Sequence, residues 1–205
     1  MSPELAVAAV ALPHLLATAV RYRRHASAVD RPTFLRFGLW SAAGGLTGAL
    51  LQAGLSAPAL LAALGALLIA TGLASLTGNF GGRRPGRPAA LTLGLLSGLF
   101  GGLAGNQGGL RAAGLLAFEL PPRAFLATST AVALLVDLAR TPVYLIRAGP
   151  RLWPLALPIA VAAVGCLLGT VWGERVLLRM PASVYRRVVG AGVSAVGVWL
   201  LSRAL

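Results

Sequence analysis

Apolar residues dominate the chain in long runs separated by short polar segments. The main runs cover residues 5–20, 34–55, 58–77, 124–146, 152–173 and 183–202. A helix needs roughly 20 apolar residues to cross about 30 Å of hydrocarbon, so each run predicts a membrane-spanning helix. A glycine-rich stretch at 90–118 adds a seventh run, which polar residues interrupt. The pattern predicts an all-α, polytopic transmembrane bundle of about seven spans, one of them broken.

Composition supports a membrane protein. Hydrophobic residues make up 57% of the chain and charged residues 11%, with a mean hydropathy of +0.81, outside the range of soluble domains. The net charge is +13, but the arginines that produce it lie in short loops between apolar runs. We therefore interpret the charge as a topology signal and expect no nucleic-acid partner. The single Cys166 excludes a disulfide within the chain and a thiolate metal cluster, and we expect no cofactor.

The distribution of arginines predicts an orientation. A basic cluster follows the first apolar run instead of preceding it, which favours a first span with an outer N-terminus over a cleaved signal peptide. With seven crossings, the loop 21–36, the loop 83–87, the turn 147–151 and the tail all fall on one side, with eleven arginines against six. We predict a multi-pass protein of the plasma membrane, with the N-terminus outside and the C-terminus in the cytoplasm.

The two halves of the chain resemble each other after a shift of about 121 to 122 residues. The shift superposes a loop signature and a glycine pair, namely Tyr22, His25, Ala26, Gly44 and Gly48 on Tyr144, Arg147, Ala148, Gly165 and Gly169, and a small gap then brings Pro58 onto Pro181. We predict a first repeat at 1–78, a basic cytoplasmic loop at 79–89 and a second repeat at 90–205. The repeats are expected to be parallel. The first lacks the glycine-rich opening element, either through loss or because the chain begins downstream of it.

The glycine-rich segment GGLAGNQGGLR at 101–111 carries the candidate chemistry. Glycines at every fourth position upstream predict a close approach by another helix. Glycines weaken a helix by about 1 kcal/mol each relative to alanine, so the cluster around 105–109 predicts a break, with a second half-helix starting near Gly108. The free N–H groups and dipole of such a half-helix favour an anion, as does Arg111. The alternative is a plain loop at the outer surface.

The next run brings hydroxyl groups at ATST, residues 127–130. Such hydroxyls either bond their own helix backbone or face a neighbouring element. The substrate-binding residues that we predict on the broken segment and the facing helix are Asn106, Gln107, Gly108, Gly109, Arg111, Ser129 and Thr130.

Ionisable residues inside a span are costly, by about 2.5 to 3.5 kcal/mol, and normally face a partner or a cavity. Asp137 and Arg140 are spaced three apart, so they can pair on one helix face. The pair is either a structural ion pair or a coupling site at which Asp137 exchanges a proton or Arg140 senses the anion. Tyr144 belongs to the same polar stripe or to an interfacial aromatic belt, and His14 either packs between helices or relays protons.

The order of these features resembles the sulfite exporter TauE/SafE family of membrane transporters. The features are GLFGGLAGNQGGLRAAGLL, a restart with the ATST helix, a basic turn and two further spans. The family is built from two such repeats, each typically opening with a GxGGG-like segment and continuing with an A-x-x-T-S-like helix; here GNQGG stands in place of GxGGG. The resemblance implies a sulfur-containing or carboxylated organic anion, such as sulfite or a sulfonate, as substrate.

Together these observations predict a transporter for a small anion in the lipid bilayer, with homo-oligomerisation left open. The chain shows no nucleophile with a matching base, no metal-ligand cluster and no phosphate loop, so we predict that it is not an enzyme. The alternative function is a membrane interaction subunit that packs through its glycine faces and transports nothing.

Overall fold

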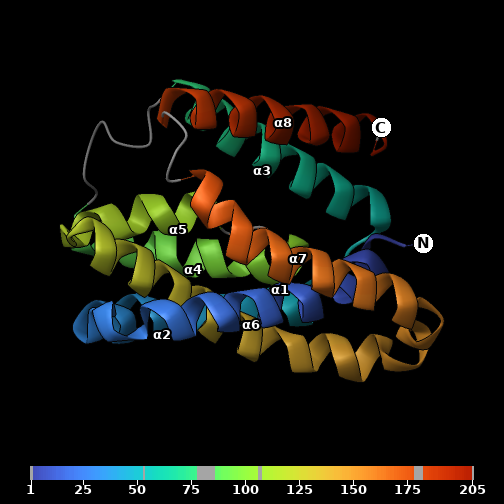
Figure 1. The fold of residues 1–205 in the computed structure, drawn as a ribbon. Helices are drawn as coiled ribbons and strands as arrows, with labels where there is room; N and C mark the ends of the chain where they lie inside the picture. The colour runs from blue at the N-terminus through green and yellow to red at the C-terminus, as the bar shows by residue number, and fades with distance from the viewer. Residues whose placement is uncertain (1, 53, 78–85, 106–107, 178–181, 205) are drawn as a thin grey trace.

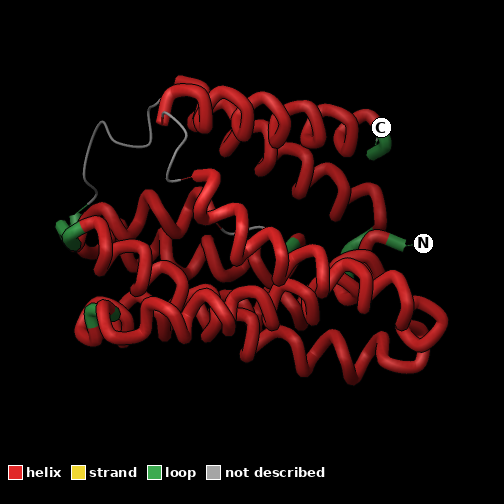
Figure 2. Tube along the Cα trace, in the orientation of Figure 1, coloured by secondary structure: helices red, strands yellow, loops and turns green. Residues whose placement is uncertain are grey.

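A computed structural model describes residues 2–52, 54–77, 86–105, 108–177 and 182–204. Every regular element in these ranges is a helix: α1 (Pro3–His25), α2 (Arg31–Gln52), α3 (Ala57–Thr77), α4 (Arg87–Ala104), α5 (Gly108–Leu115), α6 (Pro122–Leu152), α7 (Ala156–Leu177) and α8 (Ala182–Ser202), with short 3₁₀ turns η1 (Ala26–Ala28), η3 (Leu116–Phe118) and η4 (Trp153–Leu155). The predicted all-α fold is confirmed (Figures 1 and 2).

Among the described residues, four segments are long and apolar enough to cross a membrane. They are Glu4–Ala28, Ala57–Thr77, Arg87–Ala104 and Pro122–Gly173, the last of which joins α6 and α7. Apolar side chains are exposed around the bundle, including Leu39, Ile146 and Trp172. A surface of this kind is suited to lipid rather than to water, in agreement with the multi-pass membrane protein that the sequence predicts.

The bundle has two ends that differ in composition. Ser2, Gln52, Arg147 and Arg151 line one pocket, and both chain termini lie at this end, on the right in Figure 1. We call it the N-terminal end. At the other end, Asp30, Arg36, Arg87 and the segment 117–120 line a second pocket. We call this the basic end.

Helices α4 and α5 form a hairpin that enters and leaves at the basic end. The far end of α4 reaches Gln52, the last residue of α2, whose amide bonds the carbonyl of Leu103. The chain then turns back, so that Gly114 of α5 lies against Leu93 and Phe37. The break predicted near Gly108 is confirmed, because α4 ends at Ala104 and α5 starts at Gly108. The segment 90–118 therefore forms a hairpin that goes out and returns, not one helix that runs from end to end of the bundle, although α4 by itself is long and apolar enough to be a candidate span.

This hairpin changes the predicted topology. The loop after α1 lies at the basic end, whereas Arg147 donates to the carbonyls of Ala49 and Leu50 at the N-terminal end. The two basic loops therefore lie at opposite ends, and the expectation that parallel repeats place them on one side is wrong. Helix α8 runs antiparallel to α3, so the C-terminus joins the N-terminus at one end (Figure 1). Placing the two termini on opposite sides is likewise wrong.

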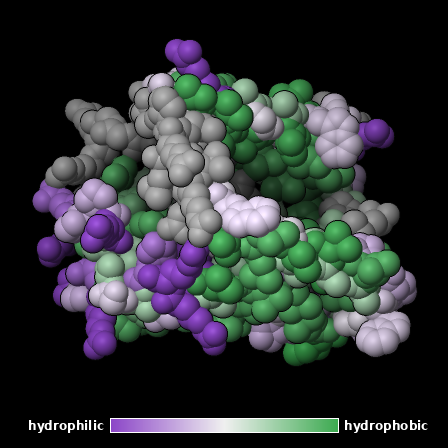
Figure 3. Space-filling model, in the orientation of Figure 1, coloured by the Kyte–Doolittle hydropathy of each residue, from purple (hydrophilic) through white to green (hydrophobic). Residues whose placement is uncertain are grey.

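With the returning hairpin, the two ends of the bundle differ strongly in their number of arginines. Ten arginines of the described residues belong to helix ends and connections at the basic end: Arg21, Arg23, Arg24, Arg31, Arg36, Arg87, Arg123, Arg175, Arg186 and Arg187. Of the arginines that the structure describes, three belong to the N-terminal end: Arg147, Arg151 and Arg203. Hydrophilic residues gather at the basic end in the space-filling view (Figure 3). The positive-inside rule associates an excess of this kind with the cytoplasmic side.

Helices α2 and α4 pack backbone to backbone through glycines. A Cβ atom on Gly98 would lie 1.8 Å from the carbonyl oxygen of Ser41, and one on Gly44 would lie 2.1 Å from that of Leu95. This is the close approach that the glycine spacing predicts. The equivalent glycines on α7, Gly165 and Gly169, have no atom within 4 Å of such a Cβ position. The α2–α4 contact therefore fixes the hairpin against the rest of the bundle.

Candidate functional site

The end of α4 lies inside the bundle, and side chains from other helices satisfy its carbonyl groups. Gly105 takes a left-handed conformation with φ of 77° and donates its N–H to the carbonyl of Gly101 at 3.0 Å. The guanidinium of Arg140 donates to this same carbonyl, and the hydroxyl of Tyr144 donates to the carbonyl of Gly102. Gln52 donates to the carbonyl of Leu103 at 2.8 Å. An unpaired carbonyl in hydrocarbon costs several kcal/mol, so these three side chains make the break tolerable.

Asp137 holds Arg140 in position for this capping. Arg140 is 2% exposed and Asp137 is completely buried. Arg140 donates to Oδ1 of Asp137 from Nε at 3.0 Å and from Nη2 at 2.8 Å, which leaves Nη1 for Gly101. The spacing-based prediction that Asp137 and Arg140 pair is confirmed. In this geometry, Arg140 and Tyr144 act on the backbone of α4.

The second oxygen of Asp137 faces α1. His14 donates from Nδ1 to Oδ2 of Asp137 at 2.7 Å, and the side chain of His14 is 42% exposed. Thr18 lies 3.4 Å from the same ring nitrogen. His14 therefore connects the buried carboxylate to an accessible space.

Two cavities lie near the capped end of α4. One, of about 340 Å³, is bounded by α1, α3 and the turn, and His14, Gly105 and Arg140 line it. The other, of about 580 Å³, is open toward the N-terminal end, and its lining includes Gln52, Tyr144 and arginines 147 and 151. The first cavity thus contains the end of α4, and the second contains its capping residues Gln52 and Tyr144 together with Glu4 and the two arginines.

Arg111 lies on the returning helix α5 and contacts α6. Its Nε donates to the hydroxyl oxygen of Ser129 at 3.0 Å. Its Nη1 is buried and has no hydrogen-bond partner among the described residues. Arg111 also interacts electrostatically with Asp137 and Arg140. A buried guanidinium nitrogen with an unused donor favours the binding of an anion, because charge-assisted hydrogen bonds from guanidinium are strong and directional.

The remaining predicted binding residues have different surroundings. The hydroxyl of Thr130 donates to the carbonyl of Leu126 at 2.8 Å, the back-bonding alternative for such residues. Gly108 is exposed and begins α5 beside Gly109, three positions from Arg111. Asn106 and Gln107 lie outside the described residues. The structure brings Arg111 and Ser129 together but turns the hydroxyl of Thr130 to its own backbone.

Two contacts near the candidate site are not predicted from the sequence. Gln52 caps α4, and the sequence feature that could have identified it is an amide side chain at the end of an apolar run. Thr128 accepts a hydrogen bond from the backbone N–H of Asp30 at 2.9 Å and so connects α6 to the start of α2. Among these hydroxyl residues, only the three-dimensional contacts distinguish one that joins helices from one that bonds its own backbone.

The comparisons with known proteins agree with this arrangement of helices and polar groups. Residues 1–200 match the family described as sulfite exporter TauE/SafE. No curated protein and no solved structure gives a significant match. Because the family match covers nearly the whole chain and agrees with the motifs seen in its sequence, the chain belongs to the sulfite exporter TauE/SafE family.

Proposed function

We propose that the protein transports a small sulfur-containing anion of the sulfite or sulfonate type and that Arg111 is its principal ligand. Membership of a family of membrane transporters supplies the general activity. The observation that carries the site is the buried Nη1 of Arg111, which has no partner among the described residues. A sulfite or sulfonate group offers several oxygens to such a donor, and the hydroxyl of Ser129 can donate to one of them.

The charge balance supports an anion at this position. Among the described residues around the hairpin, Arg111 and Arg140 face a single buried carboxylate, Asp137. One positive charge is therefore uncompensated when His14 is neutral. Because an unpaired charge in a low-dielectric interior is costly, a bound monovalent anion would be favoured. The N–H groups in the first turn of α5, which have no acceptor within that helix, would add to this attraction.

The anion would pass the hairpin between the basic end and the N-terminal cavity. The excess of arginines favours the basic end as cytoplasmic, which places both termini outside. Arg111 contacts α6 near its beginning, toward the basic end, whereas Arg147 and Arg151 line the cavity at the other end. Basic groups toward both ends of the bundle would give an anion favourable positions before and after it passes the hairpin.

Replacing Arg111 by glutamine is expected to lower sulfite or sulfonate flux at least tenfold. Loss of a charged hydrogen-bond partner costs about 1.5 to 3 kcal/mol, and each 1.4 kcal/mol is a factor of ten. The measurement is uptake of labelled anion into inverted membrane vesicles that hold equal amounts of each variant. Arg123→Gln is the matched control because Arg123 is an exposed arginine at the start of α6. Equal flux in the Arg111 variant and the wild type would refute the site.

The same assay separates transport from the alternative of a non-transporting interaction subunit. Under that alternative, purified protein in vesicles would move no sulfite, sulfonate or carboxylate, and the protein would be recovered in a stable complex with another membrane protein. Flux by the purified chain that depends on Arg111 would exclude this alternative. We favour transport because a buried guanidinium with a free donor contributes little to packing between subunits.

We also propose that His14 and Asp137 couple the anion to a proton. His14 lies at the boundary between the buried carboxylate and the cavity that Arg140 and Gly105 line. The charged groups around it are Asp137 and Arg140 on α6 and, further away, Arg111 on α5. A proton on His14 adds positive charge near the anion, so proton and anion would bind with mutual reinforcement.

Replacing His14 by glutamine is expected to abolish the response of flux to an imposed pH difference. Glutamine can still donate a hydrogen bond to Asp137, but it does not titrate between pH 5 and 8. The measurement is anion flux with and without a gradient of one pH unit in the same vesicles. Flux without a gradient should persist in the variant. A gradient response as large as that of the wild type would rule out His14 as the coupling group.

A further inference from the structure

An apolar groove with a polar head lies on the side of the bundle at the basic end. Its volume is about 370 Å³, within the range of roughly 300 to 1,000 Å³ typical of ligand pockets. It is formed by the end of α1, by η1, by the start of α2 and by α6. The lining residues are Tyr22, Ala26, Val29, Arg31, Phe34, Leu35, Ala131, Leu134, Leu135 and Leu138. The transport site does not use any of them.

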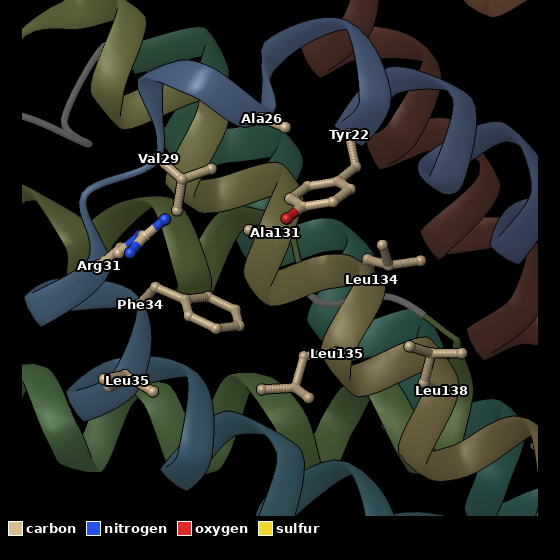
Figure 4. Close-up of a pocket in the computed structure, with 10 residues that line it drawn as sticks. All are labelled: Tyr22, Ala26, Val29, Arg31, Phe34, Leu35, Ala131, Leu134, Leu135 and Leu138. Atoms are coloured by element: carbon tan, nitrogen blue, oxygen red, sulfur yellow. The ribbon is translucent and has the colours of Figure 1, made fainter.

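The groove has the polarity of a lipid rather than of a small soluble ion. Figure 4 shows the ring of Tyr22 with its hydroxyl toward Ala131, and the guanidinium of Arg31 beside Val29. From Ala131 to Leu138 the wall is aliphatic and descends about 10 Å along α6. Leu35 and Leu138 are more than half exposed, at 55% and 54%. The apolar part is therefore open sideways toward lipid.

We propose that this groove binds one anionic phospholipid, with the phosphate at Arg31 and Tyr22 and an acyl chain along the leucines of α6. Charge complementarity selects the anionic headgroup. Arg31 is exposed at the groove mouth, and α1 adds Arg21 and Arg23 nearby in the chain. The neighbouring carboxylate of Asp30 accepts the N–H of Thr33 and lines the pocket at the basic end, and it is not among the residues that line this groove.

The groove lies where a lipid at the protein surface could be held by both its headgroup and its acyl chain. Tyrosine and arginine are suited to the interface, with apolar stems in the bilayer and polar tips in the headgroup layer. Basic pockets between transmembrane helices bind anionic headgroups at the leaflet that carries them. An occupying lipid would bridge α1, α2 and α6, the helices that carry His14, Gln52 and Arg140.

Native mass spectrometry of the full chain tests the proposal, with phosphatidylglycerol and phosphatidylcholine as probes at equal concentration. The wild type should retain phosphatidylglycerol preferentially. Arg31→Gln should reduce that preference about fivefold, the effect of one basic group near an anionic headgroup. Arg36→Gln is the matched control: it removes the same charge from the same helix, but Arg36 lines the other pocket.

A second variant tests the groove itself. Leu134→Trp fills the aliphatic part, so it should lower retention of phosphatidylglycerol without a change of net charge. Equal retention of both phospholipids by the wild type would overturn the proposal, since the groove would then hold any chain. An effect of Arg36→Gln as large as that of Arg31→Gln would also overturn it, because the preference would then belong to the whole basic end.

Discussion

Replacing Gly98 by alanine is expected to displace the hairpin and to destabilise the protein by about 2 kcal/mol, an overpacking cost of about 3 kcal/mol less about 1 kcal/mol from the better helix propensity of alanine. The added methyl group would lie 1.8 Å from the carbonyl oxygen of Ser41 and 2.8 Å from the backbone nitrogen of Gly45. Both are backbone atoms of α2, so no side-chain rotation can relieve the contact. Overpacking of this kind costs about 1 to 3 kcal/mol, and we expect the upper end because two whole helices must separate.

The matched control is Gly165→Ala on α7. Both glycines are helical, so the intrinsic gain of about 1 kcal/mol from alanine is the same in the two variants. The Cβ position on Gly165, however, has no atom within 4 Å. Thermal unfolding of both variants in detergent is the measurement. Gly98→Ala should melt well below the wild type and Gly165→Ala at or slightly above it. A melting temperature of Gly98→Ala equal to that of Gly165→Ala would mean that the glycine contact does not hold α4.

The same glycines show what could be predicted from the sequence. The four-residue spacing of Gly94, Gly98 and Gly102 predicts a helix that another helix approaches closely, and α2 does so. The density of glycine around Gly105 predicts the break, and Gly105 adopts the left-handed conformation that ends α4. These are local properties of backbone and composition, which a single sequence contains.

The direction of the chain after the break could not be read in the same way. A segment that crosses a bilayer and one that enters and returns have the same hydropathy. With seven crossings, the turn after Tyr144 and the loop after Tyr22 are predicted to lie on the same side. The contact of Arg147 with Ala49, at the end of α2, instead puts this turn at the end of the bundle opposite to that loop. A hairpin in place of a crossing reverses the direction of every later segment, which is why the two basic loops lie at opposite ends and both termini lie at one end.

The long-range partners of the polar groups also could not be predicted from the sequence. Asp137 and Arg140 are one helical turn apart, so their pairing is a local prediction, and it is confirmed. The contact of His14 with Asp137 joins residues 123 positions apart, and that of Gln52 with Leu103 joins residues 51 apart. Only the packing of α1 and α2 against the hairpin and α6 produces these contacts.

Replacing Asp137 by asparagine is expected to be the most destabilising change of a single polar group. It leaves the guanidinium of Arg140 buried without a counter-charge, and breaking a buried ion pair in this way costs about 3 to 5 kcal/mol. Arg140→Gln should cost a similar amount, because it leaves Asp137 with only His14 and removes one donor from Gly101. Unfolding in a denaturing detergent titration measures both.

The double variant separates the pair from its parts. If Arg140 is held mainly by Asp137, the double variant Asp137→Asn with Arg140→Gln should lose much less free energy of unfolding than the sum of the losses in the two single variants. His14→Gln should have a small effect on stability, because Arg140 still compensates the charge of Asp137. Arg123→Gln is the control for the loss of an exposed charge. Additive costs would show that Asp137 and Arg140 act independently.

The experiment also decides between the two roles that the Asp137–Arg140 spacing left open. A structural pair predicts that flux and stability fall together in Asp137→Asn, since a loosened Arg140 no longer caps α4 and the hairpin moves. A coupling residue predicts that stability is retained while the pH response of flux is lost. Because Asp137 contacts His14 through one oxygen and Arg140 through the other, we expect the structural loss to dominate in Asp137→Asn and the coupling loss to be visible alone in His14→Gln.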